Sequence, residues 1–168
     1  MNVQEREAAI AALGNKEALS VLIALPQKLD PTLPASEVEQ KEALAALLKQ
    51  EQKANLPTNI TLDEQQNGDA ARSLLLIIAQ TSMDAEQQKK FDVLLAFPPE
   101  PPLGFLPLAA IPLIAGSIAL LYVVGHLQFS RSGEGKWSFS YDPTKKTPMD
   151  ESMKDIIKIM AKVTGMSS

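Results

Sequence analysis

Residues 105–129 read FLPLAAIPLIAGSIALLYVVGHLQF, and no charged side chain occurs between Glu100 and Arg131. The first twenty residues of this stretch are apolar apart from one glycine and one serine. A helix rises about 1.5 Å per residue, so twenty residues match the roughly 30 Å hydrocarbon core of a bilayer. The stretch therefore predicts a single transmembrane helix at residues 105–125, and the rest of the chain is interpreted around it.

The predicted span contains a patch of small side chains behind two prolines. Pro112 removes a backbone hydrogen bond, so it is expected to kink the helix unless the helix begins close to it. Small side chains let membrane helices approach closely, and the patch therefore predicts a helix-packing face. Its members are Ala115, Gly116, Ser117 and Ala119.

His126 is the only histidine of the chain, and the chain contains no cysteine. A histidine at the end of a membrane helix is a candidate ligand for a haem or chlorin, or a proton carrier. The alternative is an interfacial histidine without a ligand, and the lack of a second histidine favours it. We accordingly predict no metal site and no cofactor, with His126 as the one candidate cofactor-binding residue.

Residues 126–168 predict a tail with two elements. A turn-rich SGEG sequence followed by the alternating KWSFSYD sequence predicts a β-hairpin at 126–141. Apolar residues spaced three and four apart predict an amphipathic helix at 149–164. Aromatic side chains concentrate at membrane interfaces, so the hairpin's aromatic face is a candidate membrane interface, although packing on its own helix is an equal alternative. These aromatic residues are Trp137, Phe139 and Tyr141.

Residues 1–97 predict an acidic helical bundle, because nine Lys and Arg stand against fourteen Asp and Glu there. A stiff Pro-rich spacer at 98–104, which begins PPEPP, separates the bundle from the apolar stretch. The buried face of the last helix of the bundle is expected to contain Phe91, Val93, Leu94 and Leu95. The expected helices are 3–13 capped by Asn2, 16–25 limited by Pro26, 37–54, 70–81 capped by Asp69, and one that begins at Ser82 or Asp84 and ends near Phe97.

The sequence contains no phosphate-binding glycine loop, zinc-protease motif, serine-nucleophile motif or EF-hand, so we expect no enzymatic activity. A net charge of −4 provides no basic surplus for nucleic acid. The sequence therefore predicts a mainly α, single-pass membrane protein that is a structural or docking subunit of a larger membrane protein complex. Its expected partners are the lipid bilayer and other membrane-protein subunits, and the charges flanking the span favour a cytoplasmic C-terminus.

Two other functions fit the same sequence. One is a membrane-perturbing, pore-forming effector in which the bundle is a sensor domain. The other is a soluble α+β binding module, in which the apolar stretch lies inside the protein's own core. The oligomeric state does not follow from the sequence under any of the three.

Overall fold

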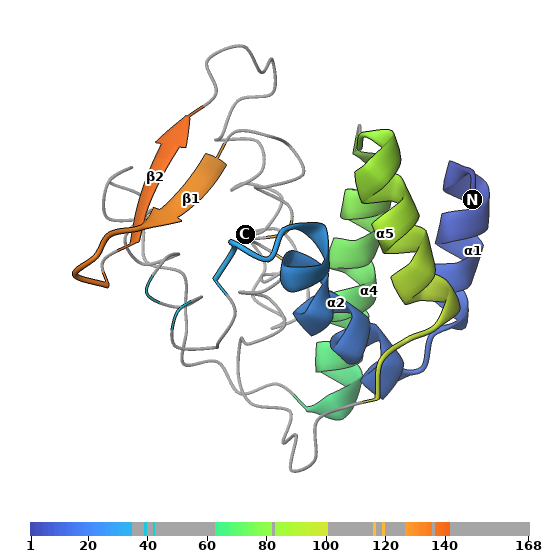
Figure 1. The fold of residues 1–168 in the computed structure, drawn as a ribbon. Coiled ribbons are helices and arrows are strands. Elements are labelled where there is room, and N and C mark those ends of the chain that lie inside the picture. The colour runs from blue at the N-terminus through green and yellow to red at the C-terminus, as the bar shows by residue number, and fades with distance from the viewer. Residues whose placement is uncertain are drawn as a thin grey trace, which may run out of the picture.

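Four helices make up most of the described part of the chain. The computed structural model describes residues 1–34, 39, 42, 63–81, 83–100, 116, 119, 127–135 and 137–141. Its helices are α1 (Val3–Ala12), α2 (Asn15–Leu29), α4 (Glu64–Gln80) and α5 (Ala85–Ala96). They lie side by side in Figure 1. The expectation of a mainly helical protein is therefore confirmed for these residues.

Two expected helices lie almost entirely outside the described residues. Of the helix expected at 37–54, only Glu39 and Glu42 are described, and both have helical backbone. The amphipathic helix expected at 149–164 lies outside the described residues. Both helices stay predictions.

Side-chain caps begin α1 and α5 where the sequence indicates. The Asn2 side chain accepts a hydrogen bond from the Glu5 N–H at 2.8 Å, and the Glu5 carboxylate accepts one from the Asn2 N–H at 2.6 Å. Asp84 and Gln87 make the same reciprocal pair at the start of α5. Each pair satisfies two backbone donors that the first turn of a helix leaves without a partner.

Two helices are longer than expected because burial outweighs local helix-breaking tendencies. Pro26 does not end α2, which continues to Leu29 with Pro26 and Leu29 both buried. Gly68 lies inside α4, which begins at Glu64 with Asp63 as its cap. Proline and glycine weaken isolated helices, but packing of an apolar face contributes more to helix stability in a folded protein.

The core lies where α4 and α5 each pack against both α1 and α2. Its largest side chains are fully buried and come from all four helices. Removing side chains of this size from water stabilises the fold by roughly 1.5–3 kcal/mol each. They are Ile10, Leu19, Leu22, Leu25, Leu74, Leu75, Ile78 and Phe91.

The start of α2 lies so close to α4 that only glycine fits at position 68. A Cβ added to Gly68 would overlap Asn15 Oδ1 and would lie 2.7 Å from Asn15 Cβ. Asn15 is itself held there, since it accepts a hydrogen bond from Arg72 and donates one to Gln65. The glycine that weakens the helix locally is therefore required by the approach of its neighbour.

Two short strands form an antiparallel pair, β1 (Leu127–Arg131) and β2 (Trp137–Tyr141). Figure 1 draws them to one side of the helices. Gly135 precedes β2 with φ of 80°, a conformation that glycine adopts without steric cost. Opposed residues include Leu127 with Tyr141, Phe129 with Phe139, and Arg131 with Trp137.

The predicted membrane localisation is wrong. Among the helices of the described residues, none combines the length and the apolar character that crossing a bilayer requires. The single-pass topology, and the orientation inferred from the flanking charges, depend on that localisation and are wrong as well. Most of the predicted span at 105–125 lies outside the described residues, and within it only Gly116 and Ala119 are described.

These two residues lie inside the protein. Both have helical backbone and are buried. A Cβ added to Gly116 would lie 2.7 Å from Leu74 Cδ1 and 3.0 Å from Leu22 Cδ1, so this glycine lies against the α2–α4 core. A protein interior selects apolar residues as a bilayer does, and the sequence pattern does not distinguish the two.

Substituting Gly116 tests this packing. We expect Gly116→Leu to lower the free energy of unfolding by about 1–3 kcal/mol, because the new side chain would overlap Leu22 and Leu74. Gly133→Leu is the matched control, since a Cβ at Gly133 meets nothing within 4 Å. Urea denaturation followed by circular dichroism measures both. Equal midpoints for the two variants would contradict burial of Gly116 against the bundle.

Candidate interaction site

Most residues singled out from the sequence lie where the structure gives no side chain. His126, Ala115 and Ser117 are outside the described residues, so ligand binding by His126 stays a prediction. For the aromatic residues of β2 the structure gives the backbone and its pairing. The membrane contact expected of these aromatic residues depends on the predicted membrane localisation, which the structure contradicts.

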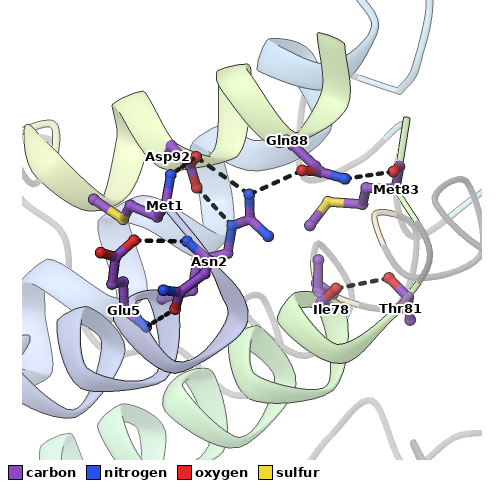
Figure 2. Close-up of polar contacts among 9 residues, drawn as sticks. Met1, Asn2, Glu5, Ile78, Thr81, Met83, Gln88 and Asp92 are labelled. Atoms are coloured by element: carbon purple, nitrogen blue, oxygen red, sulfur yellow. Dashed lines mark hydrogen bonds and ion pairs between the residues drawn. The ribbon is translucent and has the colours of Figure 1, made fainter. Parts of the chain in front are cut away.

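The structure instead draws attention to a buried arginine that joins α1 to α5. Arg6 is 4% exposed. Its Nε donates to Asp92 Oδ1 at 2.6 Å and its Nη2 to Asp92 Oδ2 at 3.2 Å, a two-point ion pair. Nη2 also donates to Gln88 Oε1 at 3.2 Å, and the Gln88 amide donates to the Met83 carbonyl at 2.8 Å (Figure 2). A charge taken out of water needs such partners, so the geometry fixes how α1 meets α5.

Asp92 is held in its charged form by this arrangement. Partial burial raises the pKa of its carboxyl. The hydrogen bond and charge of Arg6, together with those of the Met1 amino group 2.9 Å from Asp92 Oδ2, lower that pKa by more. The net pKa therefore lies below its ordinary value of 3.8. Asp92 is thus a fixed negative charge near neutral pH and is unsuited to proton transfer there.

Next to the ion pair, α5 presents a second, outward stripe that is apolar. Val93 is 42% exposed and Phe97 is 78% exposed, although Val93 was expected on the buried face. The side chains that α5 buries are Phe91, Leu94 and Leu95. The error arises because adjacent residues on a helix point about 100° apart, so Val93 lies on a different face from Leu94.

The outward stripe borders a hollow of about 430 Å³. We call its apolar rim the Phe97 patch and define it as Met1, Val93, Ala96 and Phe97. Polar members of the same hollow are Gln88, the Arg6–Asp92 pair and the exposed Lys89. The hollow therefore combines an apolar rim, the Arg6–Asp92 ion pair and the positive charges of Lys89 and the Met1 amino group, which is a composition suited to holding another polypeptide.

A hollow of about 480 Å³ lies between α1 and α4, but its polar groups are engaged within the fold. Arg72 donates to Asp69 Oδ1 at 2.5 Å, to the Leu13 carbonyl at 3.2 Å and to Asn15 Oδ1 at 2.9 Å. The Ser73 hydroxyl donates to the Asp69 carbonyl at 2.8 Å. The bonds to Leu13 and Asn15 join α4 to the turn between α1 and α2 and to the start of α2, and those to Asp69 lie within α4. Gln66 Oε1 accepts from the Asp63 N–H at 3.0 Å, so each polar side chain of this hollow has a partner in the fold.

Two further observations limit the chemistry assigned to the described residues. No group of three or more His, Cys, Asp or Glu side chains among them is placed to hold a metal ion. Comparison of the chain with protein-family models, with curated proteins and with solved structures finds no match. The candidate site therefore rests on its own geometry, and the Phe97 patch is the strongest candidate.

Sequence reasoning missed the ion pair and the patch, although each leaves a signal. Arg6 lies one turn before Ile10 and so falls on the face of α1 that is buried. Val93 and Phe97 are also four residues apart, and they continue a stripe that begins at Lys89. The sequence does not indicate which acidic residue pairs with Arg6, because Arg6 and Asp92 are separated by 86 positions.

Removing the charge of Asp92 is expected to destabilise the protein at neutral pH. Asp92→Asn leaves the Arg6 guanidinium buried without its counter-charge, at a cost of about 2–4 kcal/mol. The control is Glu86→Gln, which removes an exposed pair with Lys90 that is worth about 1 kcal/mol or less. Chemical denaturation at pH 7 compares the two. Equal losses would contradict a special role for the buried pair.

The Asp92 carboxylate is also expected to make the free energy of unfolding depend on pH in the acidic range. Because the pKa of Asp92 is lower in the folded state, its stabilising effect is present above its unfolded value of 3.8 and is lost as the pH falls through the lowered pKa. Unfolding free energies of wild type and Asp92→Asn should therefore converge below about pH 4. A constant difference between the two proteins from pH 7 to pH 2 would contradict the lowered pKa.

Proposed function

We propose that the protein is a non-enzymatic protein-interaction module whose binding surface is the Phe97 patch. The observation that carries the proposal is where apolar side chains are exposed. Among the described residues, four large hydrophobic side chains are exposed, and three of them, Met1, Val93 and Phe97, border the same hollow. The fourth, Val3, is in the first turn of α1, two residues from Met1.

Clustering of this kind supports binding rather than chance exposure. Scattered exposed apolar residues are ordinary, whereas a cluster rimmed by polar groups is typical of an interface. Aromatic side chains such as Phe97 contribute large contact areas at interfaces. The rest of the described bundle keeps its large apolar side chains mainly buried, so the contrast with this corner is sharp.

The support beneath the patch is rigid, which favours recognition of a defined partner. Arg6 and Asp92 fix the contact between α1 and α5, and Phe91 anchors α5 in the core with no exposed surface. A surface held in one geometry loses little conformational entropy on binding. The absence of enzymatic motifs from the whole sequence agrees with a binding role.

Site-specific photo-crosslinking in cells that make the protein tests the proposal. A photo-reactive phenylalanine analogue is incorporated at Phe97, at Val93 or, as a control, at Lys16, which is exposed on α2. We expect one adduct of the same mass from Phe97 and Val93, and no such adduct from Lys16. A Val93→Asp substitution should abolish the adduct formed from position 97, because it places a charge within an apolar contact.

Other patterns of labelling would count against the surface. An adduct that forms equally from Lys16 would show non-specific contact. No adduct from either patch position would contradict the proposal. Val93 and Phe97 are exposed, so we expect these variants to keep the unfolding midpoint of wild type, and a shifted midpoint would disqualify a variant as a test.

A further inference from the structure

Phe97 is followed directly by a proline segment that leaves the bundle. The Phe97 N–H donates to the Val93 carbonyl at 2.9 Å, which is the last hydrogen bond of α5. Pro98 and Pro99 have no backbone N–H, so the helix cannot continue through them. Both prolines are half-buried, and Glu100 after them is exposed. In the sequence two more prolines follow, which gives FPPEPP.

We infer that the partner of the Phe97 patch carries an aromatic-lined groove that binds an extended proline segment, and that the bound segment begins with Phe97-Pro98-Pro99-Glu100. This inference rests on the proposed function and names the class of partner. Grooves of this class bind polyproline II segments, whose rigid backbone loses little entropy on binding. Proline rings fix φ near −65°, so the segment is already restricted before a partner arrives.

Three observations distinguish this segment from a simple spacer. A spacer has no need of an apolar anchor, yet Phe97 is the most exposed large hydrophobic side chain among the described residues. Its position as the C-cap of α5 ties the proline segment to a rigid helix. Glu100 adds an exposed negative charge, so the complementary groove has a basic rim.

The test is binding of the full-length chain to a panel of purified SH3, WW and EVH1 domains, measured by biolayer interferometry. We expect at least one domain to bind wild type. Phe97→Ala and the double variant Pro98→Ala/Pro99→Ala should each weaken that binding by about tenfold or more, as loss of an anchor residue does. Pro31→Ala is the matched control, because Pro31 is an exposed proline in the loop after α2, and its binding should equal that of wild type.

Charge provides a second readout for the same complex. Glu100→Lys should weaken binding more at low salt than at high salt, because salt screens exposed charges. An affinity of Glu100→Lys equal to that of wild type at every salt concentration would overturn the basic rim.

The outcomes separate this inference from the proposed function. Binding that survives Pro98→Ala/Pro99→Ala, or no binding to any domain of the panel, overturns recognition of the proline segment. If the photo-crosslinked adduct at Phe97 and Val93 also persists in the double proline variant, the interaction surface stands and the class of partner is wrong. Self-association that Phe97→Ala abolishes, without binding to the panel, would assign the patch to a second copy of the chain and overturn the inference.

Discussion

Close packing between α2 and α4 is the constraint on which the described helices depend. Leu22 and Leu74 are both fully buried in this part of the core, and two glycines allow close approach to these helices. Gly68 admits the start of α2 beside Asn15, and Gly116 fits against the two leucines with no room for a methyl group. Because interiors are packed as densely as organic crystals, the addition of even one methyl group at either glycine requires neighbouring atoms to move.

The contact between α1 and α5 includes a buried ion pair, whereas the contact between α2 and α4 is mainly apolar. This difference bears on function. Apolar attraction has no preferred direction, whereas the two-point ion pair between Arg6 and Asp92 requires one orientation of the guanidinium. The pair is therefore well suited to placing the outer stripe of α5 against the first turn of α1. Val93 and Phe97 can remain exposed because α5 is held by its other faces.

Local signals in the sequence predict the starts of α1 and α5 but not the full extent of α2 and α4. The cap at Asn2 follows from residue chemistry alone, and for α5 the same chemistry leaves Ser82 and Asp84 as alternatives, of which the structure has Asp84. The sequence predicts that Pro26 limits one helix and that Gly68 precedes another, but both residues lie inside helices because burial outweighs their local effect. A bilayer and a protein core select the same apolar residues, so the sequence alone does not show that Gly116 packs against Leu74. The candidate site depends on the pairing of Arg6 with Asp92, two residues far apart in the sequence, and such a pairing cannot be inferred from a single sequence.

The 86-residue separation of Arg6 from Asp92 also has a consequence for synthesis. Chains are made at about 5–20 residues per second, so Arg6 leaves the ribosome roughly 4–17 s before the carboxylate that neutralises it. Until then α1 can pack against α4, but the Arg6 guanidinium has no counter-charge. The ion pair that fixes α1 against α5 can therefore form only after α5 has been made.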